Sequence, residues 1–180
     1  MSTFLAALWT TLGLLRSGDS DALRHTAPSY LTEEAARTHL AAATLAGEAF
    51  SVDPALLLAV AWHESRYDAG AQSREPGRRW SCGAMTPEPH AEPCAPVELT
   101  AVGGYVAGAR HLRMWLDRYE GDETKALRAY EGGGTLVQIC ERDGVHFVRE
   151  GVDACDVKKA FQDRATWIRS VTHHYKGATT

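Results

Sequence analysis

A glutamate that follows a strongly apolar segment is the residue of this chain best suited to acid–base chemistry. Asp53 predicts the N-cap of a helix with Pro54 at its first position, and residues 55–62 are apolar on every face. We therefore expect this helix at the centre of the domain. Glu64 lies at its C-terminal end, where burial and the helix dipole both disfavour a carboxylate. The pKa of Glu64 should rise, so that the protonated acid can donate a proton to a leaving-group oxygen, as a glycosidase general acid does. The alternative is an exposed glutamate just past a helix end.

Metal-assisted chemistry is not expected at this glutamate. His63 and Glu64 begin the HExxH pattern of zinc proteases, but Arg66 and Tyr67 follow Ser65, so the pattern fails. We accordingly expect neither a metal nor a cofactor.

The four cysteines suggest disulfides rather than a zinc cluster. None of them forms a CxxC pair, and all lie in polar, proline-rich or glycine-rich stretches. Pairing of Cys82 with Cys94 and of Cys140 with Cys155 would staple two irregular loops, each closure contributing on the order of 3 kcal/mol. Such bonds indicate an oxidising, extracytoplasmic location: periplasmic, secreted or virion-associated. Other connectivities, and four free thiols in a cytosolic protein, are the alternatives.

Helices should position these groups, and the fold class predicted is mainly α. Helix signals cover 32–50, where Thr32 marks the start, then 53–62, about 104–119, 123–130 and 158 to about 174. Three glycines at 132–134 end the fourth helix. Residues 68–96 are rich in proline and glycine, which predicts a long ordered loop. Residues 135–157 read as mostly polar loop, with a short strand at 145–148 as the alternative. No convincing strand pair is expected anywhere in the chain.

Length and charge limit the organisation and the partners. A chain of 180 residues suits one domain, here 32–180, preceded by an N-terminal segment, 1–31. The net charge of −4 argues against nucleic acid as a partner. The apolar stretch 4–15 is too short to span a bilayer, and no lysine or arginine precedes it, so we expect a packing segment or an atypical signal.

Four motifs, in order along residues 35–134, resemble those of the goose-type lysozyme and soluble lytic transglycosylase (SLT) family. Residues 52–73, VDPALLLAVAWHESRYDAGAQS, are similar to its first motif, in which a central helix ends in the catalytic glutamate followed by serine. Residues 83–86 (GAMT) resemble its Gly-Leu-Met-Gln turn. Residues 105–112 (YVAGARHL) and 126–132 (ALRAYEG) resemble its Asn-Ile-x-x-Gly-x-x-Tyr-Leu and Ala-Leu-x-Ala-Tyr-Asn-x-Gly motifs. The resemblance implies a lysozyme-like single domain with a disulfide-stapled loop lobe.

The resemblance also implies a site. Glu64 would be the catalytic residue, and the substrate-binding residues expected beside it are Ser65, Met85, Thr86, Tyr130 and Glu131. The alternative for Tyr130 is simple packing at a helix end. Tyr67 and Trp80 are further candidates, because their rings suit stacking on sugars, whereas Trp62 is expected in the core.

Three positions depart from the family pattern, and one loop is extra. Thr86 replaces the glutamine of the turn, Gly104 replaces the asparagine of the helix motif, and Glu131 replaces the asparagine after Tyr130. A second carboxylate at 131 should raise the pKa of Glu64 further if the two approach closely. The stretch between Cys82 and Cys94 is not part of the family motif, and it either frames the cleft or decorates the surface.

The function expected from the resemblance is cleavage of the β-1,4 bond between N-acetylmuramic acid and N-acetylglucosamine in peptidoglycan, with 1,6-anhydromuramoyl products. A hydrolase of the same fold is the first alternative, and it requires a second carboxylate about 6.5–9.5 Å away. The candidates for that carboxylate are Glu75, Glu88, Glu92 and Glu131. The second alternative is a catalytically weak descendant that binds glycan or serves a secretion or virion assembly.

Overall fold

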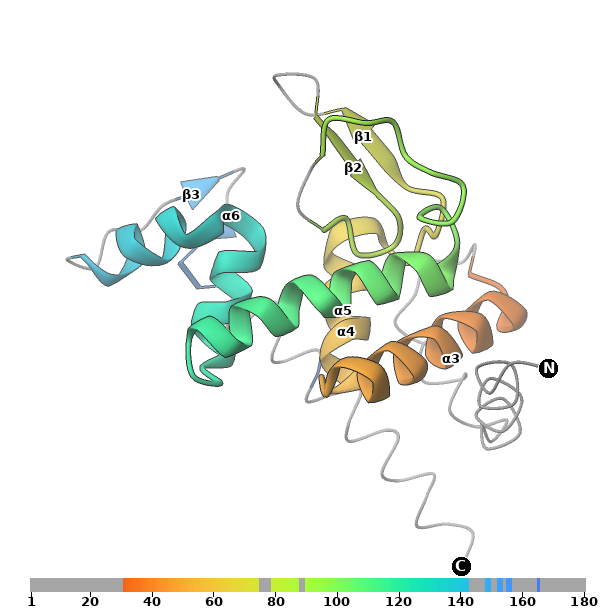
Figure 1. Cartoon of the computed structure of the whole chain (residues 1–180), viewed down its shortest axis with the longest axis horizontal. Coiled ribbons are helices and arrows are strands. Elements are labelled where there is room, and N and C mark those ends of the chain that lie inside the picture. Colours follow the sequence, from red (N-terminus) through yellow and green to blue (C-terminus); the bar gives the residue numbers. More distant parts are fainter. Residues whose placement is uncertain are drawn as a thin grey trace, which may run out of the picture.

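The fold is mainly helical, as predicted. The computed structural model describes residues 31–74, 79–87, 90–142, 148–149, 152–153, 155–156 and 165 (Figure 1). Within these ranges there are four helices and two short hairpins. The helices are α3 (Glu33–Phe50), α4 (Pro54–Ser65), α5 (Ala101–Arg118) and α6 (Glu123–Glu141). None of these helices is both long enough and apolar enough to cross a membrane.

The starts of α3 and α4 follow directly from their capping residues. The Thr32 hydroxyl accepts a hydrogen bond from the amide of Ala35 at 3.1 Å, and the Asp53 carboxylate accepts one from Ala55 at 2.8 Å. Both predicted starts are confirmed. Ser51 adopts a left-handed conformation (φ 54°) and ends α3, so the chain turns at once into α4.

Helix α4 occupies the centre of the domain, as its composition predicts. Residues 55–61 are all buried, which accounts for the absence of a polar face on this helix. Helices α3 and α5 both pack against α4 and against each other, while α6 packs on α5 (Figure 1). The helix ends at Ser65, beyond the predicted limit of 62, and so includes Glu64 in its last turn.

Helix α6 differs from the prediction in its second half. The glycines do interrupt it, since Gly132 and Gly133 leave helical geometry and Gly133 has a φ of 68°. The helix then resumes and runs to Glu141, where polar loop was expected. Leu136 and Val137 are buried, and this apolar face explains why the second segment stays helical.

A small loop lobe lies between α4 and α5 and stands over the first half of α5 (Figure 1). It contains an antiparallel hairpin of β1 (Gln72–Arg74) and β2 (Trp80–Cys82), in which Ser73 faces Ser81. The prediction that this region holds no strand pair was wrong, because strands of three residues are too short to show alternation. The Cys82–Cys94 disulfide, with a Cα–Cα distance of 5.7 Å, is confirmed.

The second predicted disulfide is also confirmed. Cys140, near the end of α6, is bonded to Cys155, and the Arg128 guanidinium donates to the carbonyl of Cys155 at 2.7 Å. Between the two cysteines, strands β3 (Val148–Arg149) and β4 (Val152–Asp153) form an antiparallel pair. The strand expected at 145–148 coincides with β3 only at residue 148. Residues 1–30 and the helix expected from 158 lie outside the described residues, except that Ala165 is helical and buried.

Candidate active site

Glu64 lies in the last turn of α4 and is partly buried. The Thr86 hydroxyl donates a hydrogen bond to Glu64 Oε2 at 2.6 Å. Burial is the largest effect and raises the pKa of Glu64 from 4.5 to about 7, while the Thr86 hydrogen bond opposes this rise. The negative charge of Glu131 raises the pKa further, and the positive charge of Arg66 lowers it. The expected direction of the shift is therefore confirmed, and so is the sign of the Glu131 effect.

The turn that carries Thr86 is held against the end of α4 by Ser65. The Ser65 hydroxyl lies 2.7 Å from the carbonyl of Ala84 and 3.1 Å from that of Ala61, and it accepts from the amide of Asp68 at 3.1 Å. We therefore assign Ser65 to positioning the turn. Thr86 itself has a φ of 38°, a conformation uncommon for a β-branched residue, which its hydrogen bond to Glu64 helps to hold.

Glycines on α5 allow this turn to approach the helix closely. A Cβ on Gly104 would lie 2.7 Å from the amide nitrogen of Ala84, and one on Gly108 would lie 2.5 Å from both Cβ and Sδ of Met85. Gly83 has a φ of 79°, and a Cβ there would lie 2.4 Å from the carbonyl oxygen of Glu98. Gly104, where the family motif has asparagine, is thus a packing residue.

Met85 and Tyr130 join the turn to α6. The Tyr130 hydroxyl donates to the carbonyl of Met85 at 2.7 Å, and its ring meets that of His111 edge-on at 5.0 Å. Burial and the nearby charge of Glu64 both raise the pKa of Tyr130. The Met85 side chain is completely buried, which argues against the sugar contact expected for it. Tyr130 is 9% exposed, so packing accounts for most of its surface while its hydroxyl lies in the same electrostatic environment as Glu64.

The two aromatic candidates for sugar stacking differ in exposure. Tyr67 is only 3% exposed and packs against His39 and Trp62, so it belongs to the core. This burial contradicts the expectation that its ring stacks on sugars. Trp80, on β2, is partly exposed, and the Arg74 guanidinium lies 5.6 Å from its ring centroid. Trp62 is partly buried against the core, as expected.

Of the candidate second carboxylates, Glu131 is exposed and is the one whose charge acts on Glu64. Glu92 is exposed in the loop lobe. Glu75 and Glu88 lie outside the described residues.

Two residues near the site were missed from the sequence. The positive charge of Arg66 lowers the pKa of Glu64, and its guanidinium lies 5.0 Å from the Trp62 ring centroid. The i,i+4 spacing of Trp62 and Arg66 in the sequence could have indicated this contact. His111 accepts a hydrogen bond from the Trp115 indole at 3.0 Å and supports the Tyr130 ring. The same i,i+4 spacing marks His111 and Trp115.

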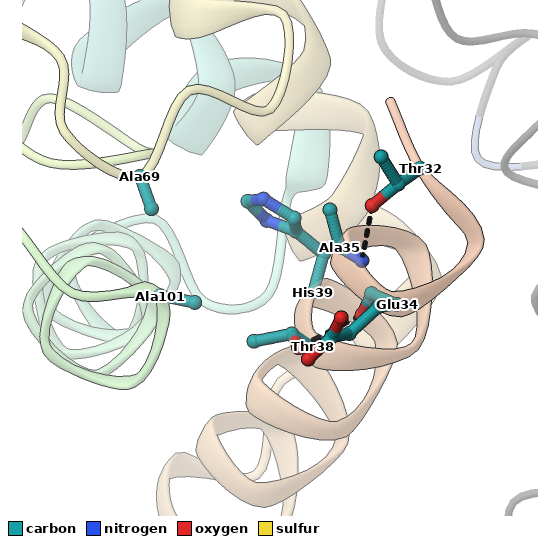
Figure 2. Close-up of a pocket in the computed structure, with 7 residues that line it drawn as sticks. All are labelled: Thr32, Glu34, Ala35, Thr38, His39, Ala69 and Ala101. Atoms are coloured by element: carbon teal, nitrogen blue, oxygen red, sulfur yellow. Dashed lines mark hydrogen bonds between the residues drawn. The ribbon is translucent and has the colours of Figure 1, made fainter. Parts of the chain in front are cut away.

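A separate cavity of about 340 Å³ lies at the start of α3, where His39 points toward Ala69 and Ala101 (Figure 2). Burial lowers the pKa of His39 to about 4, and its Nδ1 lies 3.3 Å from the Tyr105 hydroxyl. None of the predicted site residues lines this cavity. Its position and its neutral histidine mark it as part of the packing between α3 and α5.

In comparisons with known proteins, no family model, no curated protein and no solved structure matches the chain.

Proposed function

We propose that this protein is a peptidoglycan lytic transglycosylase with a lysozyme-like fold and an extracytoplasmic site of action. The observation that carries the proposal is the state of Glu64, a partly buried carboxyl with a pKa of about 7 at the end of the central helix. The motif resemblance supports the substrate class, the glycan strands of peptidoglycan. The two disulfides support the location.

A pKa near 7 suits a group that must first donate and then accept a proton. Protonated Glu64 gives its proton to the glycosidic oxygen, and the bond between that oxygen and the anomeric carbon of N-acetylmuramic acid breaks. Glu64, now ionised, takes the proton of the muramoyl 6-hydroxyl, whose oxygen attacks the anomeric carbon. The product is a 1,6-anhydro ring, no water is consumed, and the glutamate returns to its protonated state.

Thr86 has a defined part in this cycle. Its hydroxyl stabilises the ionised form that exists after the first proton transfer, because a hydrogen bond donated to a carboxylate favours the charged state. Without this contact burial would favour the protonated form still more and would oppose the first proton transfer, from Glu64 to the glycosidic oxygen. Thr86 is therefore a positioning and tuning residue for Glu64.

One observation favours a second candidate, a muramidase that hydrolyses the same bond. Glu131 is exposed and its charge acts on Glu64, so among the described candidates it is the carboxylate that would activate a water. In that case the products end in reducing sugars.

The masses of the products distinguish the lytic transglycosylase from the muramidase. Purified peptidoglycan is incubated with the protein, and the masses of the released fragments are measured by mass spectrometry. The lytic reaction predicts fragments lighter by one water than the reducing products of hydrolysis, and Glu131→Gln should leave this product in place. Reducing ends that disappear in Glu131→Gln would assign the base to Glu131, and no release at all would favour a glycan-binding or structural role.

A further inference from the structure

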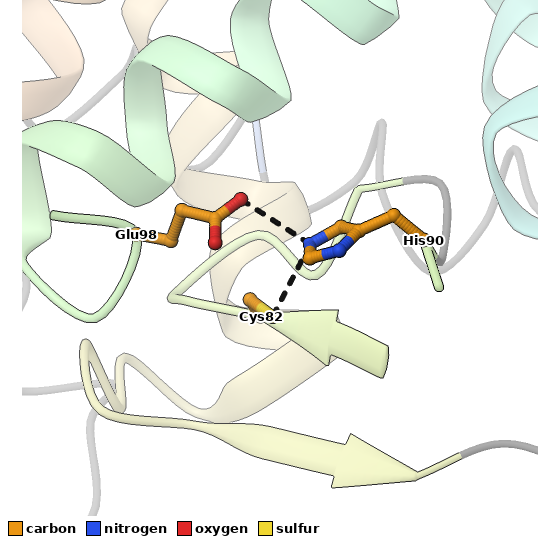
Figure 3. A group of neighbouring side chains, drawn as sticks. All are labelled: Cys82, His90 and Glu98. Carbon is orange, nitrogen blue, oxygen red and sulfur yellow. Dashed lines mark hydrogen bonds and ion pairs between the residues drawn. The ribbon is translucent and has the colours of Figure 1, made fainter. Parts of the chain in front are cut away.

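The loop lobe holds a second cluster of reactive side chains, distinct from the Glu64 site. Cys82 on β2, His90 and Glu98 point toward one another (Figure 3), and their sulfur, nitrogen and oxygen atoms all lie within 4.8 Å of one another. Cys82 is bonded to Cys94. One sulfur, an imidazole and a carboxylate therefore lie together, and the second sulfur of the disulfide is bonded to the first. Thiolate, imidazole and carboxylate are all ligand types that zinc accepts.

We propose that, once the Cys82–Cys94 disulfide is reduced, Cys82, Cys94, His90 and Glu98 bind one zinc ion. Two distances within the cluster match the edges of a tetrahedral site. His90 Nε2 lies 3.5 Å from Cys82 Sγ and 3.2 Å from Glu98 Oε1. Zinc bond lengths of about 2.3 Å to sulfur and about 2.0–2.2 Å to nitrogen and oxygen give tetrahedral edges of about 3.5–3.6 Å and about 3.3–3.4 Å.

The backbone around the cluster is held by contacts that do not depend on the disulfide. His90 exchanges two backbone hydrogen bonds with Trp80 of β2, at 2.7 and 3.0 Å. The second oxygen of Glu98 accepts from the amide of Ala95 at 2.7 Å. Zinc binding then requires that the two sulfurs separate to about 3.7 Å, the S–S edge of such a site, and that the Cys94 sulfur moves beside His90 and Glu98.

The redox step decides whether the site exists. In the disulfide neither sulfur is a thiolate, so the cluster lacks two of its four ligands. A dithiol reductant supplies two electrons and two protons, the S–S bond breaks to give two thiols, and the reductant becomes a disulfide. Zinc then displaces the two thiol protons and binds the thiolates.

The ion can reach the site from solvent, because the side chains of His90 and Glu98 are 37% and 30% exposed. Zinc and the disulfide are then alternative staples for the same loop. Cys82 directly precedes Gly83, the first residue of the turn that carries Thr86.

The experiment uses the full chain with Cys140→Ser and Cys155→Ser, which removes the second disulfide, whose thiols would also bind zinc once reduced. The protein is reduced with a phosphine, desalted without oxygen, and titrated with Zn²⁺ against a colorimetric chelator and with Co²⁺ as a spectroscopic probe. We expect one zinc per reduced chain, a thiolate-to-cobalt charge-transfer band, and binding to the oxidised form that is weaker by more than about 100-fold.

Matched variants test the ligand set. His90→Ala should weaken zinc binding by more than about 100-fold and Glu98→Gln by at least about 10-fold, whereas Glu92→Gln, an exposed carboxylate of the same lobe, should change it by less than twofold. The assignment is overturned if the reduced protein binds no zinc, if the oxidised protein binds it equally well, or if both His90→Ala and Glu98→Gln retain the parent affinity.

Discussion

At Glu64, burial and hydrogen bonding act on the same pKa in opposite directions. Burial dominates and holds the pKa at about 7, and the hydroxyl of Thr86 limits the rise. The sequence indicated the burial, because the whole helix before Glu64 is apolar. The resemblance placed Thr86 beside Glu64 but did not indicate the hydrogen bond between them, since the two residues are 22 positions apart and are brought together by the turn and α5.

Replacing Thr86 should move the pH dependence of the reaction. Thr86→Ala removes the hydrogen bond that favours the ionised acid, so the pKa of Glu64 should rise above about 7. Activity that needs the protonated acid then persists to higher pH, so the alkaline limb of the pH–rate profile shifts to higher pH. Thr86→Ser, which keeps the hydroxyl, is the matched control and should retain the parent profile. A downward shift in Thr86→Ala would contradict this assignment.

The same pKa predicts how stability depends on pH. Below pH 4.5 Glu64 is protonated in both the folded and unfolded states, so burial carries no ionisation cost. Between pH 4.5 and about 7 only the unfolded state ionises, so folding stability falls as the pH rises through this window. The two pKa values correspond to a loss on the order of 3 kcal/mol.

Glu64→Gln removes this titration. The free energies of unfolding of the variant and the parent are measured in urea at pH 4 and at pH 8. The difference, variant minus parent, should be larger at pH 8 by on the order of 3 kcal/mol. A difference between the two proteins that is the same at both pH values would show that Glu64 titrates normally.

Among the elements, α5 places the turn through its glycines. A Cβ at Gly108 would lie 2.5 Å from Met85 Cβ, an atom that cannot swing away, so the turn would have to shift. Gly108→Ala should lower the free energy of unfolding by about 1–3 kcal/mol and reduce activity, because the displaced turn carries Thr86.

Gly134 offers the matched control for this substitution. It lies in the resumed part of α6, and an added Cβ would make only ordinary contacts, the nearest at 3.6 Å from the Tyr119 hydroxyl. Gly134→Ala should stabilise the protein by about 0.5–1 kcal/mol. Equal effects of the two substitutions in chemical denaturation would contradict the packing argument.

The elements that the sequence predicted are those with local signals. Thr32 and Asp53 cap their helices with their own side chains, and the apolar run before Glu64 specifies burial without knowledge of any partner. The hairpin β1–β2 and the second half of α6 were missed. The hairpin depends on backbone pairing across a loop, and the glycine kink in α6 looks in the sequence like a helix end.

At the scale of the whole molecule, the two disulfides stabilise the segments that have little regular secondary structure. One closes the loop lobe and the other ties the end of α6 to the segment after β4. Both pairings were predicted from proximity in the sequence. The site was predicted only in part, because Met85 and Tyr67 lie in the core although the motif and the ring chemistry suggested sugar contacts.

Loss of the second disulfide should be costly for stability. Cys140→Ser with Cys155→Ser opens a loop with a sequence separation of 15, and the free energy of unfolding should fall by about 3 kcal/mol. Glu64 lies on another element, so the proposed peptidoglycan cleavage should remain below the unfolding temperature. Thermal unfolding and the activity assay check the two statements, and an unchanged midpoint would show that the bond carries no stability.

The measurement that tests the account most directly is the rate at which purified peptidoglycan releases soluble fragments with the parent and with Glu64→Gln. The amide keeps the shape of the side chain and loses the transferable proton, so the variant should fold and release fragments at about 1% of the parent rate or less, a loss of about 100-fold or more. Glu48→Gln, an exposed glutamate on α3, is the control and should match the parent. Release by a folded Glu64→Gln protein at a rate comparable to the parent would contradict the assignment of Glu64 as the acid.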